Sequence, residues 1–396
     1  MEHTNFIEPA DHVKNISEYY FSVKLQEVAK MNTEGKNVIS LGVGSPDLPP
    51  SEYVVEELCK VASRNDVHGY QPYTGIPELK QAYADWYKKS YDVAVTSSEV
   101  LPLIGSKEGI MHISLAFLNV GDGVLVPNPG YPTYTSVSKL MRANIIAYDL
   151  LETKDWMPDF EALEMMDLSG VKLMWVNYPN MPTGANATIE LFEQLVAFGK
   201  KHSIIICHDN PYSFILNDTP LSILQVEGAK DICIELNSMS KSHNMAGWRM
   251  GVLASNEQFV KWVLKVKSNV DSGQFRPMQM AAIKALDTPM QWHDNMNLLY
   301  EQRRLWAFKI MTILGCKYNP NQVGLFVWAK IPSYEKGSED LINGILYNAH
   351  VFITPGFIFG SNGERYIRIS LGSSATKIKV AYERIADYLI TRKQIF

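Results

Sequence analysis

The chain has 396 residues, of which 46% are apolar and 20% are charged, and its 42 acidic and 37 basic residues leave a net charge of −5. This length predicts two domains that share a cleft, and the mixed charge disfavours nucleic acid or an anionic membrane as a partner. Because the segment from Met1 to Lys14 carries acids and no apolar run, and no stretch offers the roughly 18 apolar residues of a membrane span, we expect a cytoplasmic protein.

The cysteines lie far apart in the sequence and form no CxxC pair. They are Cys59, Cys207, Cys233 and Cys316. This spacing disfavours a disulfide framework and a zinc site, so we expect reduced thiols and no bound metal.

Short apolar runs alternate with longer amphipathic stretches between about residue 120 and residue 255. The runs have the length of buried parallel strands and are bounded by Pro, Asn, Asp and Gly. They are Val124–Val126, Leu173–Val176, Ile204–Cys207, Ile232–Ile234 and Gly251–Ala254. Between them, Ile189 to His202 has apolar residues at helical spacing. The alternation predicts an α/β domain around a mostly parallel sheet, which we assign to residues 49–280.

The C-terminal part shows long helical patterns followed by strand-like runs. These runs are Leu325–Ala329, Val351–Thr354 and Tyr366–Ser370. We predict that residues 281–396 form a smaller α+β domain together with residues 1–48.

Polar, turn-forming residues follow the predicted strands of the larger domain. They begin at Asn128, Asn177, His208 and Asn237. Open α/β sheets bind ligands at the carboxyl ends of their strands. The sequence therefore predicts a ligand site at this edge of the sheet.

The run Ser238-Met-Ser-Lys241 stands at one of these strand ends, and Arg249 follows eight residues after the lysine. A lysine amine forms a Schiff base with an aldehyde, while hydroxyls and a guanidinium bind phosphate. Together these residues indicate a phosphorylated aldehyde as cofactor.

Several ordered motifs make the chain resemble the class I/II aminotransferases of pyridoxal 5′-phosphate (PLP) fold type I, along nearly its whole length. The motifs are Leu41-Gly-Val-Gly-Ser-Pro-Asp, Gly69-Tyr-Gln-Pro-Tyr-Thr-Gly, Pro182-Thr-Gly, Asp209-Asn-Pro-Tyr, the lysine motif and Tyr366-Ile-Arg-Ile-Ser. The resemblance is closest to the branch of LL-diaminopimelate and aspartate aminotransferases. It implies a homodimer that moves an amino group from an L-amino acid to a 2-oxo acid, with glutamate and 2-oxoglutarate as one pair.

The resemblance also implies the residues around the cofactor ring. Lys241 would hold PLP as an internal aldimine and then act as the base that moves the Cα proton. Asp209 would pair with the pyridine nitrogen, Tyr212 would bind O3′, and Tyr131 would stack on the ring.

The cofactor phosphate would be bound by two groups of residues. By resemblance, one group consists of Ser238, Ser240 and Arg249. The other is formed by the backbone N–H groups of Ser106 and Lys107, which stand before an apparent helix.

The remaining implied residues bind substrate or reach between subunits. Arg368 would bind the substrate α-carboxylate with the help of the Gly44 N–H, and Arg276 is our candidate for a distal carboxylate. Tyr70 would reach the phosphate of the neighbouring subunit. We interpret Arg365 as a surface residue, because it differs from Arg368 in strand parity.

The chain departs from the family at Met181, where an asparagine usually donates to O3′. Asn180 or Asn177 could take this role. Otherwise Tyr212 would bind O3′ alone, and the pKa of the lysine-bound cofactor would rise.

Other functions remain open at this point. A PLP-dependent C–S lyase would share the fold and the cofactor residues. A regulatory PLP-binding protein would usually carry a DNA-binding segment, for which there is little room before Leu41. A Rossmann dehydrogenase is disfavoured, because Gly42-Val-Gly44 lacks the third glycine of that fingerprint.

Overall fold

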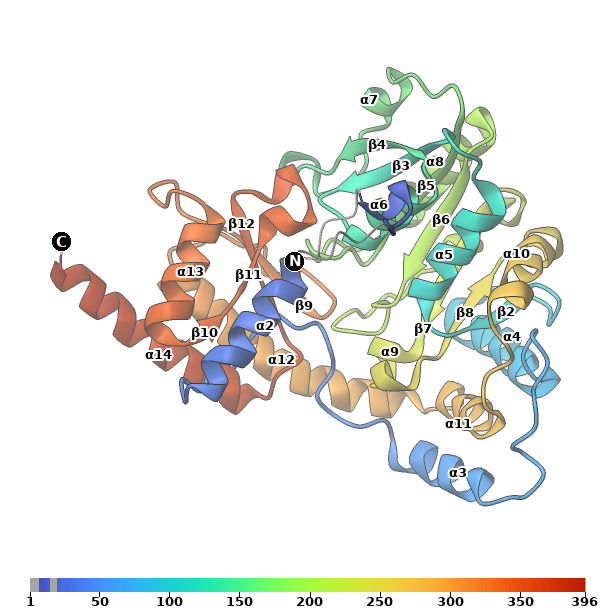
Figure 1. Ribbon diagram of the computed structural model, residues 1–396, viewed down its shortest axis with the longest axis horizontal. Coiled ribbons are helices and arrows are strands. Elements are labelled where there is room, and N and C mark those ends of the chain that lie inside the picture. The colour runs from blue at the N-terminus through green and yellow to red at the C-terminus, as the bar shows by residue number, and fades with distance from the viewer. Residues whose placement is uncertain (1–6, 15–19, 396) are drawn as a thin grey trace.

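The computed structural model describes residues 7–14 and 20–395 and combines a large sheet, a smaller sheet and a two-stranded pairing with surrounding helices (Figure 1). The strands are β1 Ile39–Ser40, β2 Val100–Leu103, β3 Gly123–Asn128, β4 Asn144–Asp149, β5 Val171–Asn177, β6 Ile205–Asn210, β7 Cys233–Ser238, β8 Gly251–Ala254, β9 Phe326–Lys330, β10 Val351–Phe352, β11 Thr354–Pro355 and β12 Tyr366–Ser370. The helices are α1 Asp11–Lys14, α2 Tyr20–Thr33, α3 Glu52–Ala62, α4 Pro77–Tyr91, α5 Ser106–Phe117, α6 Pro132–Leu140, α7 Phe160–Glu164, α8 Ile189–His202, α9 Met239–Ser242, α10 Glu257–Val270, α11 Arg276–Leu286, α12 Met290–Ile313, α13 Ser338–Ala349 and α14 Ala375–Ile395. Within these described ranges, no helix has the length and apolar character that a membrane crossing requires.

The large sheet has the strand order β2-β8-β7-β6-β5-β3-β4 among the described residues. Strands β3 to β7 pair in parallel, as predicted for the runs in β3, β5, β6 and β7. The prediction that Gly251–Ala254 is a parallel strand is wrong, because β8 pairs antiparallel with both β7 and β2. The chain between β7 and β8 contains only the single turn of α9 and a short 3-10 helix, Ala246–Trp248. This connection folds back at the same edge, whereas a parallel crossover needs an element that returns along the sheet.

The parallel strands place the polar segments named above along one edge of the sheet. Strands β3, β5, β6 and β7 end at Asn128, Asn177, Asn210 and Ser238. Since parallel strands share one direction, their carboxyl ends lie side by side, and the polar side chains that follow them can surround one ligand.

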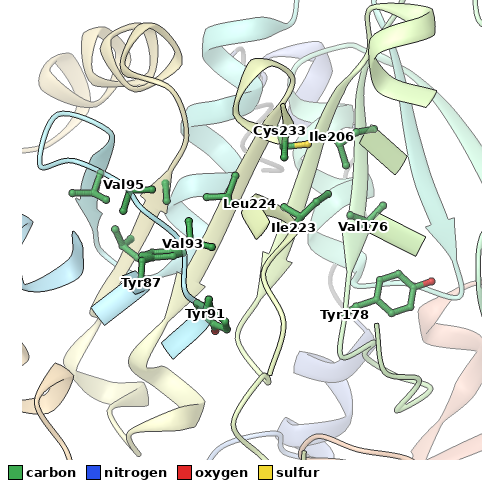
Figure 2. Close-up of a cluster of buried hydrophobic side chains, with 14 of the residues drawn as sticks. Tyr87, Tyr91, Val93, Val95, Val176, Tyr178, Ile206, Ile223, Leu224 and Cys233 are labelled. Atoms are coloured by element: carbon green, nitrogen blue, oxygen red, sulfur yellow. The ribbon is translucent and has the colours of Figure 1, made fainter. Parts of the chain in front are cut away.

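A hydrophobic cluster between α4 and the sheet supports this edge. Figure 2 shows Tyr87 and Tyr91 from α4 on one side and Val176 and Ile206 from the sheet on the other, all of them buried. Burial of each such side chain contributes about 1.5–3 kcal/mol. Tyr91 also accepts a hydrogen bond of 3.1 Å from Asn237 Nδ2, next to the end of β7. The cluster therefore holds the strand that carries the lysine motif.

The smaller sheet has the order β11-β12-β9, with Arg368 of β12 opposite Trp328 of β9 and Thr354 of β11. Strand β1 pairs with β10, so the N-terminal segment joins this part of the chain. Figure 1 shows α12 running from the region of α11 to this sheet. The predicted domain limits, 1–48 with 281–396 and 49–280, stay a prediction. Met181 and Tyr212 also join the hydrophobic cluster of the smaller sheet.

Candidate active site

A cavity of about 370 Å³ lies at the carboxyl ends of β5, β6 and β7 and reaches the smaller sheet. The predicted site residues that line it are Gly44, Ser106, Lys107, Tyr131, Asp209, Tyr212, Ser238, Ser240, Lys241, Arg249 and Arg368. The structure also describes Asn180, Tyr70 and Arg276, which are not among the residues that line the cavity.

Lys241 lies on α9, the single helical turn that follows β7. Its Nζ donates a hydrogen bond to the carbonyl oxygen of Gly44. Burial, followed by the positive charges of Arg368 and Arg249, lowers the pKa of the Lys241 amine to about 8. The neutral form of this amine, which attacks a carbonyl carbon, is therefore far more populated near neutral pH than in an ordinary lysine.

Two serines and an arginine form one end of the cavity. The Ser238 hydroxyl accepts a hydrogen bond of 3.2 Å from the Ser240 backbone N–H and lies 2.9 Å from the Ser240 hydroxyl. Arg249 Nη1 donates to the carbonyl oxygen of Ala246 at 2.9 Å, which fixes the guanidinium. Hydroxyls beside a fixed guanidinium are suited to bind a phosphate group.

The first turn of α5 closes the same end. Gly105 precedes the helix with a φ of 80°, and a Cβ at this position would lie 2.6 Å from Arg249 Nη2. Glycine is thus required both by the left-handed backbone and by the approach of the arginine. The N–H groups of Ser106 and Lys107 begin the helix, where the helix dipole favours an anion.

Asp209 lies in β6, one residue before its end, and is buried. Its Oδ2 accepts a hydrogen bond of 2.9 Å from the Tyr134 hydroxyl. Its Oδ1 is buried and accepts no hydrogen bond of normal geometry from the described residues, while the nearby Ser106 side chain has a lowering effect on the pKa of Asp209. Burial raises the pKa of Asp209 to about 6, against the opposing effect of the Tyr134 hydroxyl. A buried carboxyl group with one open oxygen is suited to accept a hydrogen bond from a charged N–H of a ligand.

Arg368 brings a positive charge to the cavity from the middle of β12, and it is only 5% exposed. Its Nη2 donates to the carbonyl oxygen of Gly42 at 2.9 Å, and its guanidinium lies 4.0 Å from the ring centre of Phe326. A Cβ at Gly44 would lie 2.6 Å from the same ring, so a glycine is needed there. A guanidinium held in this way can bind a carboxylate with two parallel hydrogen bonds.

Comparisons with known proteins identify the family of this chain. The family described as aminotransferase class I and II matches residues 36–385. The chain belongs to the class I and II aminotransferases.

Individual relatives agree with this assignment. The LL-diaminopimelate aminotransferase of Dehalococcoides mccartyi is 38% identical over 380 residues, which cover 95% of this chain and 97% of the relative. The apo structure of BacF from Bacillus subtilis is 38% identical, with a TM-score of 0.91 over 96% of this chain and 97% of BacF. An aspartate aminotransferase double mutant from Thermus thermophilus is 22% identical with a TM-score of 0.90 over 96% and 100% of the two chains, which confirms the predicted fold.

The aminotransferase is a PLP-dependent transaminase, as predicted from its motifs, and the lyase and regulatory alternatives are not favoured. The residues of the cavity fit this cofactor. The end formed by Ser238, Ser240 and Arg249 suits the phosphate, and the open oxygen of Asp209 suits the ring nitrogen. The Lys241 amine suits the aldehyde.

Of the two asparagines before Met181, Asn177 lines the cavity and Asn180 does not, and the role of either at the cofactor stays a prediction. Asn180 Nδ2 donates to the carbonyl oxygen of Asn177 at 3.1 Å, and its Oδ1 accepts hydrogen bonds from Thr183. Its amide therefore stabilises the turn. Met181 lines the cavity, and its Sδ lies 3.2 Å from Arg368 Nη1.

Tyr70 and Arg276 lie on the surface near the phosphate end. Tyr70 is 94% exposed, and Arg276 Nη2 lies 3.3 Å from Glu78 Oε1. A bridge between Gln71 and Gly273 brings their two segments together. Neither residue contributes to the cavity of its own chain.

Arg365 is not a plain surface residue, which corrects our interpretation from strand parity. Its guanidinium donates hydrogen bonds to the carbonyl oxygens of Pro332, Glu335 and Lys336. It therefore holds the turn that follows β9.

Several cavity residues were missed in the sequence analysis. They are Phe21, Tyr134, Pro211, Ala246, Phe326, Ile358 and Phe359. For Tyr134 a signal existed, because it stands three residues after Tyr131 at the start of a helical pattern and so lies on the same helix face. Phe21, Ile358 and Phe359 come from segments without a motif.

A buried charged cluster lies beneath the phosphate end. Glu108 Oε2 accepts a hydrogen bond from the Ile104 backbone N–H, and Glu108 Oε1 lies 2.7 Å from His112 Nε2. The Ile104 carbonyl oxygen in turn accepts a hydrogen bond of 3.1 Å from Arg249 Nη2. Lys267, which is 1% exposed, pairs with Asp271 at 2.6 Å and lies 3.8 Å from Glu108. Glu108 thereby holds the residue that positions Arg249.

The lowered pKa of Lys241 predicts how the apoenzyme takes up PLP. Because only the neutral amine attacks the aldehyde, the rate of covalent uptake should rise between about pH 7 and about pH 9 with a midpoint near about 8. Stopped-flow absorbance of the lysine-bound cofactor measures this rate. Arg368→Gln removes a charge that lowers the pKa and should move the midpoint upward. A wild-type midpoint at the ordinary lysine value of 10.5 would contradict the prediction.

The contact of Glu108 with Ile104 predicts weaker cofactor binding in Glu108→Gln. Loss of the carboxylate should raise the Kd for PLP about tenfold, which corresponds to about 1.4 kcal/mol, because hydrogen bonds to charged groups contribute about 1.5–3 kcal/mol. Absorbance titration of the apoenzyme measures this Kd. The matched control is Glu257→Gln on α10, whose carboxylate is 52% exposed and pairs only with Lys261 among the described residues. Equal Kd values for the two variants would refute the role of Glu108.

Proposed function

We propose that Lys241, Asp209 and Arg368 perform the transamination of this aminotransferase. The observation that carries the proposal is their convergence on one cavity. The three groups are an amine with a lowered pKa, a buried carboxyl group with an open oxygen, and a buried guanidinium. Perturbed ionisable groups that meet in a cavity are typical of catalytic sites.

Each residue has a separate task in this proposal. When bound, the cofactor supplies an aldehyde that condenses with amines and a ring that draws electrons from the substrate Cα. Arg368 and the Gly44 N–H hold the substrate α-carboxylate, which places the Cα proton near Lys241. Lys241 Nζ would accept this proton and donate it again, and Asp209 would hold a proton on the ring nitrogen of a bound cofactor.

The other residues of the cavity bind the phosphate and the ring of the cofactor in this proposal. Ser238, Ser240, Arg249 and the N-terminus of α5 bind phosphate, and Tyr131 packs against the ring. Asn177 replaces Asn180 as the neighbour of Tyr212. The supporting observation is that all of these residues except Asn180 line the cavity.

Replacement of Lys241 tests the assignment of the base. Lys241→Ala should lower multiple-turnover transamination by about 10²–10⁴-fold or more, since it removes both the attachment point and the base. The measurement follows the loss of cofactor absorbance with an amino acid and its return with a 2-oxo acid. Lys261→Ala, on the exposed face of α10, is the control and should keep the wild-type rate. Full turnover without Lys241 would refute the assignment.

We further propose that the aminotransferase is a homodimer in which each site borrows Tyr70 from the other chain. Tyr70, Tyr73 and Phe275 are 94%, 48% and 45% exposed, and the Gln71–Gly273 bridge joins their segments near the phosphate end. Gln274 Nε2 donates to the Arg249 carbonyl oxygen at 2.9 Å, which ties this surface to the site. Exposed aromatic side chains of this kind favour burial in an interface.

Complementation between inactive chains tests the shared site. When Lys241→Ala and Tyr70→Ala chains are co-refolded, half of the dimers should be hybrids with one intact site, so activity should return to about a quarter of wild type. In the control, Lys241→Ala is mixed with Asp209→Ala. These two residues serve the same cavity, so no intact site forms and no activity should return. Equal recovery in both mixtures, or none in either, would refute the shared site.

The location and the substrates belong to the same proposal. We retain a cytoplasmic location, and the free thiols of Cys59, Cys207, Cys233 and Cys316 suit a reducing compartment. The curated relatives are named for LL-diaminopimelate, and the motifs imply glutamate and 2-oxoglutarate as one pair. Which side chains the cavity accepts depends on the part of its wall that binds no cofactor.

A further inference from the structure

One part of the cavity wall belongs to none of the cofactor residues and is apolar. It consists of Phe21 from α2, Met181 from the turn after β5, Phe326 from β9, and Ile358 and Phe359 from the 3-10 helix Gly356–Phe359. We call these five residues the apolar wall. Phe326 and Phe359 also lie 4.0 Å and 4.6 Å from the Arg368 guanidinium, so the wall begins beside the predicted α-carboxylate site.

Contacts beside the apolar wall join the segments that carry it. The ring of Tyr20 meets the ring of Phe357 edge to face at 5.1 Å, which joins α2 to the 3-10 helix. A Cβ at Gly356 would lie 2.3 Å from the Gly363 carbonyl oxygen, so the backbone of the 3-10 helix packs closely against the next turn. The wall presents its apolar side chains to a ligand, and Phe21 and Ile358 in it are half-buried.

Four described lysines and arginines line the cavity: Lys107, Lys241, Arg249 and Arg368. In the proposed function Lys241 holds the cofactor, Arg249 binds its phosphate and Arg368 binds the α-carboxylate. Lys107 stands in the first turn of α5, at the phosphate end. Arg276, our candidate for a distal carboxylate, is outside the cavity of its chain and lies 3.3 Å from Glu78.

Within the wall that one chain supplies, a second carboxylate on the substrate would therefore contact apolar side chains, and a cation to pair with it would have to come from the other subunit of the proposed dimer. Burial of an unpaired carboxylate is strongly unfavourable, whereas an apolar side chain gains from the same contact. A site of this composition discriminates by the transfer free energy of the side chain.

From the apolar wall we infer that the aminotransferase prefers amino acids with uncharged, apolar side chains, aromatic ones included, over those with a distal carboxylate. The inference rests on the proposed function and names its substrate class. The curated relatives are named for LL-diaminopimelate, which carries a second carboxylate. The inference therefore gives this chain a different substrate class from the one in the names of these relatives. Glutamate, from the pair that the motifs imply, would then react with a lower ratio of maximal rate to Kd than the apolar amino acids.

Half-reactions of the holoenzyme test the preference. Phenylalanine, leucine and methionine are compared with aspartate, glutamate and LL-diaminopimelate by the rate of loss of lysine-bound cofactor absorbance. The ratio of maximal rate to Kd should be at least about tenfold larger for the apolar amino acids, since even one methylene group in an apolar pocket changes this ratio by about 10–200-fold.

Variants of the wall locate the preference. Phe21→Ala and Ile358→Ala should each lower the ratio for phenylalanine about tenfold or more and leave that for aspartate nearly unchanged. Leu298→Ala, at a 64% exposed position of α12, is the control and should change neither ratio. Binding without reaction gives a second readout. By calorimetry, 3-phenylpropanoate should bind the wild type at least about tenfold more tightly than glutarate, and Phe21→Ala should remove this difference.

The outcomes separate the inference from the proposed function. If no amino acid converts the cofactor, transamination itself fails. If the acidic amino acids react faster and Arg276→Ala removes their advantage, transamination stands and the apolar preference is refuted in favour of a cation supplied by Arg276. Equal ratios for both classes, or wall variants that affect aspartate and phenylalanine alike, also refute it.

Discussion

The geometry of this active site depends on the register between β6 and β7, and a buried polar pair fixes that register. His208 lies opposite Glu235, and His208 Nδ1 is 2.9 Å from Glu235 Oε2, with both side chains 0% exposed. The other ring nitrogen lies 2.9 Å from the Tyr178 carbonyl oxygen, and Ser222 donates to the same carboxylate. Because neighbouring residues of a strand face opposite sides, this pair directs Asp209 to the other face, where it meets Tyr134 and the cavity. A shift of β6 by one residue relative to its neighbours would exchange the faces on which His208 and Asp209 lie.

The sequence predicts the elements whose apolar pattern decides their structure. The run Ile189–His202 forms α8 with these bounds, and the runs in β3, β5, β6 and β7 form neighbouring strands. The prediction failed where the direction of a strand depends on its connection, as in β8. It also missed the edge strands β2 and β4. Strand β2 contains Pro102, which is tolerated because β2 pairs only with β8, and β4 is partly exposed and lacks a continuous apolar run.

The site was predictable where several residue types must stand in a fixed order. Lys241 with Ser238, Ser240 and Arg249 is such a set, since one ligand needs all of them. The two asparagines before Met181 could not be told apart from the sequence, because both take part in hydrogen bonds of the turn and only the folded backbone decides that Asn177 lines the cavity. The apolar wall was missed for a similar reason: a residue such as Phe21 is an ordinary helical phenylalanine until α2 docks beside Arg368.

Arg368 connects substrate binding to the strength of the base. After burial, its positive charge is the next cause of the lowered pKa of Lys241, followed by that of Arg249. A carboxylate bound to Arg368 offsets this charge, as a phosphate offsets that of Arg249. The amine is therefore most readily deprotonated before a carboxylate binds, which favours its attack on an aldehyde. A bound carboxylate raises the pKa of the amine, and the neutral amine is then a stronger base toward the Cα proton. A single buried guanidinium thus couples substrate binding to the strength of the base.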